Sequence, residues 1–150
     1  MQGKEKELEL LMDQTVQKMT RIMVVDDDST FQFIFKKQIE KFGQFEIVNE
    51  SKNGSEAIQF IRSTKKEGGQ LPELIVLDLN MPIMDGWDFL DEYGKLMSTG
   101  EGTIPICILS STINQADFDK ANTYTTVKSF FSKPVTSEQL QTMKKLAEIY

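Results

Sequence analysis

The sequence predicts an α/β fold in which helices cover both faces of a five-stranded, mostly parallel β-sheet. Three observations predict it. Five short apolar runs alternate along the chain with five segments whose apolar residues recur at helical spacing. Residues 74–77 are continuously apolar and stop at a carboxylate, as expected of a strand that is buried on both faces. The length of 150 residues suits one domain that buries about two-thirds of its unfolded surface.

The first predicted strand and helix lie within residues 21–43. Residues 21–25 are a short, mostly apolar run that ends at Asp26. Asp28 or Ser29 can cap the helix that follows, because either side chain accepts the free N–H groups of a first turn. Gly43 ends this helix. The helical spacing is set by Phe31, Ile34, Phe35, Ile39 and Phe42.

The middle of the chain repeats the pattern. Residues 45–48 predict a second strand and residues 55–65 a second helix, followed by a polar loop that contains Gly68. The run 74–77 is the third strand, and residues 86–97 predict the third helix. The apolar residues available to these two helices are Ala57, Ile58, Phe60, Ile61, Trp87, Phe89, Leu90 and Tyr93.

The last third predicts two more strands and two more helices. Residues 104–109 are a strand with Pro105 near its beginning, where the missing N–H does least harm. Residues 114–122 predict a short helix, residues 127–131 the fifth strand and residues 137–149 the closing helix. The apolar positions of that last helix are Leu140, Met143, Leu146 and Ala147.

Right-handed crossovers leave few topologies for this order of elements. The usual one at this length is the flavodoxin-like (βα)5 three-layer sandwich with strand order 2-1-3-4-5. We assign residues 21–150 to this single domain and residues 1–20 to an N-terminal extension. The extension is charged, and its apolar residues are spaced roughly as in an amphipathic helix, although a frayed tail also fits.

Composition excludes several classes of function. A net charge of −6 disfavours binding to nucleic acid through the whole surface. The chain contains no histidine, which excludes histidine catalysis, histidine metal ligands and a phosphohistidine on this chain. The single cysteine, Cys107, lies in an apolar run and predicts a core thiol. No apolar stretch approaches the length of a membrane helix, so we expect no membrane insertion and a cytoplasmic location.

Polar residues follow four of the predicted strands. They are Asp26 and Asp27, Asp78, Ser110 and Lys133. Parallel strands bring their carboxyl ends to one edge of the sheet, where α/β folds bind ligands. Three close carboxylates favour a hard cation such as Mg²⁺, which prefers a phosphate oxygen as a further ligand. A lysine and a hydroxyl can bind other phosphate oxygens, so the set predicts phosphoryl transfer to a carboxylate nucleophile.

Four stretches of the chain, in this order and spacing, resemble the receiver domain of bacterial two-component response regulators, and in form the CheY-like single-domain members. The resemblance covers about residues 21–149. The stretches are Met23-Val24-Val25-Asp26-Asp27-Asp28, Val76-Leu77-Asp78-Leu79-Asn80-Met81-Pro82-Ile83-Met84-Asp85-Gly86, Ile108-Leu109-Ser110-Ser111 and Phe130-Phe131-Ser132-Lys133-Pro134.

The resemblance implies a role for each matching position. Asp78 would be the phosphoacceptor that attacks a phosphohistidine on a sensor histidine kinase or a histidine phosphotransfer protein. Asp27, Asp78 and the backbone carbonyl of Asn80 would bind Mg²⁺, with Asp26 acting mainly through water. Lys133 would pair with the phosphoryl group, and its bond to the following proline would be cis. Such a protein is not a classical enzyme, but it would catalyse its own phosphorylation and slow dephosphorylation.

The resemblance also implies a switch. Phosphorylation of Asp78 would draw in the Ser110 hydroxyl, and Phe130 would rotate into the space below. The surface of the fourth helix, fifth strand and fifth helix would then change shape for a downstream protein target. The chain also departs from the family pattern: Phe130 stands where Tyr is common, and Ser111 stands where a small residue such as Ala is usual. Thr112 has no acid or amide group to orient a hydrolytic water, and residues 122–126 replace the usual Gly-Ala pair.

Three alternatives compete with this interpretation. Residues 24–30 also fit the opening of the haloacid-dehalogenase-type phosphatases, with Asp26 as nucleophile and Asp28 as acid–base residue. That family needs an acidic pair at a later strand end, which the chain lacks beyond Lys133. A nucleotide-binding module would need a glycine-rich phosphate loop that is absent. A degenerate receiver would bind a partner without phosphorylation, and the intact set of site residues argues against it.

Overall fold

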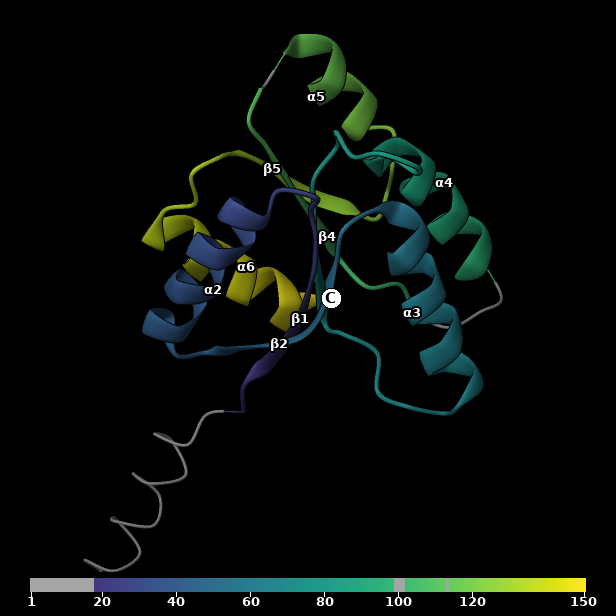
Figure 1. The fold of residues 1–150 in the computed structure, drawn as a ribbon, viewed down its shortest axis with the longest axis horizontal. Coiled ribbons are helices and arrows are strands. Elements are labelled where there is room, and N and C mark those ends of the chain that lie inside the picture. Colours follow the sequence, from purple (N-terminus) through teal and green to yellow (C-terminus); the bar gives the residue numbers. More distant parts are fainter. Residues whose placement is uncertain (1–17, 99–101, 113) are drawn as a thin grey trace, which may run out of the picture.

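The computed structural model describes residues 18–98, 102–112 and 114–150, so the predicted helical spacing at residues 1–17 lies outside the described residues. The strands and helices alternate along the chain (Figure 1). In order they are β1 (Thr20–Val25), α2 (Ser29–Phe42), β2 (Phe45–Ser51), α3 (Gly54–Lys66), β3 (Leu74–Leu77), α4 (Gly86–Leu96), β4 (Ile106–Ser110), α5 (Gln115–Ala121), β5 (Val127–Ser132) and α6 (Ser137–Ile149).

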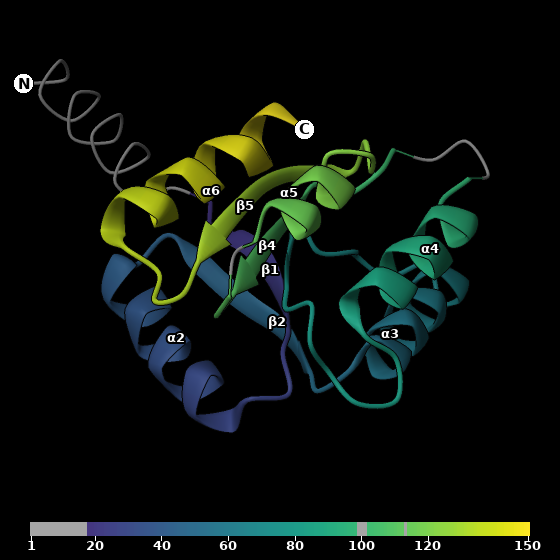
Figure 2. The same cartoon turned by 90° about the horizontal axis from the view of Figure 1, so that it is seen from above.

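The five strands form one sheet with the order β2-β1-β3-β4-β5, and every neighbouring pair is parallel. This confirms the flavodoxin-like prediction. Helices α2 and α6 cover one face of the sheet, whereas α3 and α4 cover the other (Figures 1 and 2). Helix α5 packs with the second group through Ala121. None of the helices in the described part of the chain is long and apolar enough to cross a membrane.

The sheet separates two apolar cores. Alternate residues of each central strand point to opposite faces: in β1, Val24 packs with α2 and α6, whereas Val25 packs with α3 and α4. All four residues of β3 are buried, as the continuous apolar run predicted. Cys107 is a fully buried core thiol, and burial raises its pKa to about 11.

Strand β4 begins two residues later than the sequence predicts. The phenolic oxygen of Tyr93 on α4 accepts the backbone N–H of Ile104 at 2.6 Å and donates to the Ile104 carbonyl at 3.0 Å. These bonds replace pairing to a neighbouring strand, and Pro105 has no N–H to offer. The ladder therefore starts at Ile106. Strand β2 runs three residues further than predicted, to Ser51, whereas α3, α4, α5 and α6 agree with their predicted bounds to within one residue at each end.

Candidate functional site

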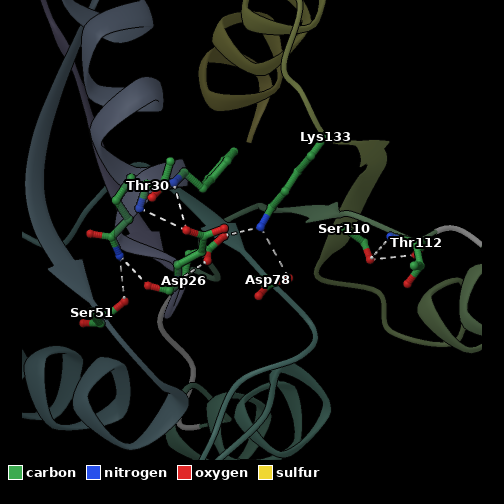
Figure 3. Close-up of polar contacts among 10 residues, drawn as sticks. Asp26, Thr30, Ser51, Asp78, Ser110, Thr112 and Lys133 are labelled. Carbon is green, nitrogen blue, oxygen red and sulfur yellow. Dashed lines mark hydrogen bonds and ion pairs between the residues drawn. The ribbon is translucent and has the colours of Figure 1, made fainter.

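The predicted site residues lie at the carboxyl edge of the sheet (Figure 3). Asp26 and Asp27 directly follow β1, and Asp78 directly follows β3, the strand that is paired beside it. Ser110 is the last residue of β4, and Lys133 directly follows β5. The parallel topology therefore brings together side chains that are up to 107 positions apart in the chain.

Asp26, Asp27 and Asp78 form an acidic pocket. One carboxylate oxygen from each residue lies within 4.8 Å of the others. Asp26 and Asp78 are only 2% and 6% exposed, whereas Asp27 is exposed. Burial, together with the nearby Asp26 charge, raises the pKa of Asp78 to about 6, and burial also raises the pKa of Asp26.

This donor set fits a divalent cation. It offers oxygen ligands alone, which suits a hard ion rather than a thiolate- or imidazole-seeking one. Lys133 offsets one of the three negative charges, so a dication would balance the other two. The acidic triad is thus able to hold a metal ion.

Lys133 supplies the positive charge of the site. Its ammonium donates to Asp26 Oδ2 at 2.6 Å and lies 3.8 Å from Asp78 Oδ1. The same charge lowers the pKa of both carboxyl groups and so opposes the effect of burial. The peptide bond between Lys133 and Pro134 is cis, as the resemblance implies.

The first turn of α2 holds Asp26 in place. Oδ1 of Asp26 accepts the backbone N–H of Asp28 at 2.9 Å. The Gln32 amide donates to the Asp26 backbone carbonyl at 2.5 Å and to that of Ser51 at 3.3 Å. Sequence reasoning missed Gln32. The available signal was its place in the first helical turn after the acidic residues, the part of a βα unit that faces the site.

The loop after β3 is packed tightly against the start of α4. Asp85 caps this helix, and the Gly86 N–H donates to the Leu79 carbonyl at 3.0 Å. A Cβ on Gly86 would lie 2.5 Å from the Asp78 carbonyl oxygen, so only glycine fits here. Asn80 is exposed, and its backbone N–H donates to the Asp78 carboxylate and lowers the Asp78 pKa. The loop thus fixes the position of the Asp78 side chain.

Ser110 and Phe130 lie beyond this acidic pocket. The fully buried Ser110 donates its hydroxyl to the Thr112 carbonyl at 2.7 Å and accepts the Thr112 N–H at 3.3 Å (Figure 3). Phe130 is half-buried, and its ring centroid lies 6.1 Å from that of Phe118 on α5. The proposed switch residues are therefore engaged with their own loop and with α5.

The segment 122–126, which departs from the family pattern, makes its own contacts with α4. The Tyr124 hydroxyl donates to Asp91 Oδ1 at 2.8 Å, and its ring stacks on Trp87 at a centroid distance of 6.0 Å. The ammonium of Lys120 lies 4.5 Å from the Trp87 ring centroid. These contacts fasten the end of α5 to α4, a role that the sequence did not reveal.

The geometry disfavours Asp26 as the nucleophile, which the phosphatase alternative requires. Both of its carboxylate oxygens are engaged, one by Lys133 and one by the Asp28 N–H. A carboxylate that already accepts two hydrogen bonds is a weaker nucleophile than one with a free oxygen. The alternative also leaves the buried Asp78 without a role.

Comparisons with known proteins show which family the chain is similar to. The family model described as response regulator receiver domain matches residues 22–145. The chain is 34% identical over 103 residues to protein-glutamate methylesterase/protein-glutamine glutaminase 3 of Burkholderia thailandensis, a match that covers 69% of this chain and 25% of that protein. It is 29% identical over 123 residues to two-component response regulator ORR41 of Oryza sativa subsp. japonica, covering 82% and 90%. The chain spans about a quarter of the length of the methylesterases that it matches.

Among solved structures, the chain is similar to the crystal structure of a two-component response regulator from Cytophaga hutchinsonii. The TM-score is 0.81 at 25% sequence identity, and the match covers 89% of this chain and all of the other. The family match extends over most of the chain, and it includes the strands that carry the acidic pocket. The chain therefore belongs to the response regulator receiver domain family.

Proposed function

We propose that the chain is a phosphoacceptor that takes a phosphoryl group from the phosphohistidine of a sensor histidine kinase or a histidine phosphotransfer protein onto Asp78. The observation that carries the proposal is the unequal engagement of the two buried carboxylates. Asp26 accepts hydrogen bonds from Lys133 and from a backbone N–H, whereas Asp78 accepts only the backbone N–H of Asn80 and lies 3.8 Å from the same ammonium. Asp78 is the carboxylate whose oxygen remains available for attack.

The transfer is a displacement at phosphorus. An Asp78 carboxylate oxygen forms the new P–O bond, while the P–N bond to the donor imidazole breaks and its electron pair stays on the ring nitrogen, which then takes a proton. The phosphoryl oxygens carry negative charge throughout. Lys133 lies close enough to Asp78 to pair with one of them, and this pairing stabilises the transferred group.

The cofactor of this proposal is Mg²⁺. Asp26, Asp27 and Asp78 would hold it, together with the Asn80 backbone carbonyl that the family resemblance implies. The ion supplies positive charge that offsets the repulsion between the pocket carboxylates and the incoming phosphoryl oxygens. Asp27 is the exposed member of the triad and leaves the pocket open to solvent on its side.

The proposed output is a change in the surface formed by α5, β5 and α6. A phosphoryl oxygen on Asp78 would compete with the Thr112 carbonyl for the Ser110 hydroxyl. A move of Ser110 would open space for Phe130, whose present neighbour is Phe118 on α5. A downstream protein in the cytoplasm would read the altered surface.

The proposal is tested by incubating the protein with acetyl phosphate and MgCl₂ and measuring its intact mass. We expect the gain of one phosphoryl group, and no gain when EDTA replaces MgCl₂. Asp78→Asn should gain nothing, because an amide is not a nucleophile at phosphorus. A gain that persists in Asp78→Asn would show that the acceptor is another residue.

Asp28→Asn is a matched control for the loss of a nearby carboxylate. Asp28 lies beside the pocket and caps α2 by accepting the N–H groups of Thr30 and Phe31. Asparagine caps a helix equally well, so the fold is kept while one negative charge is lost. We expect this variant to be phosphorylated as the parent protein is.

A further inference from the structure

The ammonium of Lys133 faces an aromatic ring as well as two carboxylates. It lies 4.1 Å from the ring centroid of Phe31, within the range of a cation–π interaction. Phe31 belongs to the first turn of α2, and Lys133 is only 14% exposed at its side chain. The contact is therefore partly desolvated, which strengthens it.

The core fixes the position of the Phe31 ring. This ring stacks on Phe35 with a centroid distance of 5.5 Å and an interplanar angle of 15°. Phe35 is fully buried in the core between the sheet, α2 and α6. Because Phe35 is fixed in the core, stacking on it restricts the Phe31 ring to one orientation, with one ring face toward Lys133. The core is thus connected to the site through Phe35, Phe31 and Lys133.

We propose that Phe31 is a positioning residue for phosphoryl transfer, and that it acts by holding the ammonium of Lys133 within reach of Asp78. This inference rests on the proposed function. An oxygen in the place of the ring would accept a strong hydrogen bond from the ammonium and keep it. A ring face attracts the charge but accepts no such bond. Lys133 can then exchange its bond to Asp26 for one to a phosphoryl oxygen without leaving the site.

A first test measures the mobility of Lys133 and needs no phosphorylation. The protein is labelled with lysine carrying ¹³C at Cε, and the Lys133 signal is assigned by its loss in Lys133→Arg. In the parent protein we expect ¹³C relaxation to give a high order parameter for this methylene, because the side chain is held in one position. Phe31→Leu keeps the apolar bulk and removes the ring face, so the order parameter of Lys133 Cε should fall. Phe31→Tyr keeps the ring and should keep the order.

Phe33→Leu is the matched control on the same helix. Phe33 also has a lysine near its ring, Lys37 at 5.6 Å, but it is 64% exposed. The same substitution there changes the helix composition equally and leaves Lys133 alone. If Lys133 is as ordered in Phe31→Leu as in the parent protein, the inference is wrong.

A second test measures the phosphorylation rate with acetyl phosphate at saturating MgCl₂. We expect Phe31→Leu to be slower by about three- to ten-fold, the effect of losing one cation–π contact. Phe31→Tyr and Phe33→Leu should match the parent protein. In a Lys133→Ala background Phe31→Leu should have no further effect, since Phe31 would act only through Lys133.

The two tests separate the failure of this inference from the failure of the proposed function. If the parent protein is never phosphorylated, the proposed function fails, and the order of Lys133 still decides whether Phe31 positions it. If the parent protein is phosphorylated and Phe31→Leu slows it equally in both backgrounds, the effect comes from the fold and the inference is overturned.

Discussion

The ammonium of Lys133 lies 1.2 Å closer to Asp26 than to Asp78, at 2.6 Å against 3.8 Å. One ammonium group thus interacts with two buried carboxylates, strongly with Asp26 and weakly with Asp78. The closer pair fixes Asp26, and the longer distance leaves Asp78 an oxygen that is free to react. This asymmetry supports the proposal that Asp26 is the supporting carboxylate and Asp78 the acceptor.

Lys133→Ala should fold and bind Mg²⁺ at least as tightly as the parent protein at pH 8. The substitution removes a cation that competes for Asp26, and the triad of carboxylates remains. Phosphorylation by acetyl phosphate should slow by at least about ten-fold, because the phosphoryl oxygens then lose the ammonium group and keep only the Mg²⁺ ion as a positive partner. Isothermal titration measures the first effect and intact mass against time the second. Loss of Mg²⁺ binding would mean that Lys133 organises the carboxylates rather than the phosphoryl group.

Asp78→Asn should stabilise the protein at pH 7.5 in EDTA. The folded-state pKa of Asp78, about 6, lies above the ordinary value of 3.8, so folding favours the protonated form. The stability that Asp78 contributes is present below pH 4 and is lost as the pH rises through 6. The ionised group then costs about 3 kcal/mol, which the amide avoids.

Urea unfolding at pH 4 and pH 7.5 measures this effect. The advantage of Asp78→Asn should be largest at pH 7.5 and should shrink as the pH falls. Glu46→Gln, at an exposed position, serves as a control and should change little at either pH. If Asp78→Asn is less stable than the parent protein at pH 7.5, the claim that the buried, ionised Asp78 carboxylate destabilises the fold is wrong.

Gly86→Ala should destabilise the fold by about 1–3 kcal/mol, the usual range for an overpacked site. The new Cβ would lie 2.5 Å from the Asp78 carbonyl oxygen and 2.8 Å from Leu79 Cα, and both are backbone atoms. Gly94→Ala in the same helix meets nothing within 4 Å and should stabilise α4 by about 0.5–1 kcal/mol. Thermal unfolding compares the stability of the two variants. Equal effects would show that helix propensity alone, and not the steric clash at Gly86, determines the change in stability.

Ser110→Ala should still be phosphorylated but should not transmit the change. The hydroxyl that bonds to the Thr112 carbonyl is the group expected to turn toward a phosphoryl oxygen, and alanine has none. Amide ¹H–¹⁵N spectra with beryllium fluoride, a mimic of the phosphoryl group, measure this. In the parent protein we expect shifts around Phe118 and Phe130. If the same shifts occur in Ser110→Ala, the switch does not depend on Ser110.

The sequence predicted the order of the strands, and with it the edge of the sheet where the polar residues meet. The carboxyl end of a buried strand is marked locally, because an apolar run stops at a charge, as it does at Asp78. Parallel pairing then places Asp26 and Lys133 beside it without further information.

The contacts between elements could not be predicted in this way. Tyr93 takes both backbone groups of Ile104 and shortens β4, which depends on how α4 packs on the sheet. In the sequence, Phe31 is recognisable only as one apolar position of a helix. Its contact with Lys133 depends on how α2 and the end of β5 are placed relative to each other. Side-chain direction across elements is set by tertiary packing, which local periodicity does not record.

The central claim, that Asp78 is the phosphoacceptor, is tested most directly by locating the modified residue. The protein is incubated with acetyl phosphate and MgCl₂ and reduced with tritiated borohydride, which converts an acyl phosphate to a labelled alcohol. The peptides are then separated and sequenced. We expect the label at position 78 alone. Label at Asp26 would favour the phosphatase alternative, and label at neither carboxylate would contradict phosphoryl transfer in this pocket.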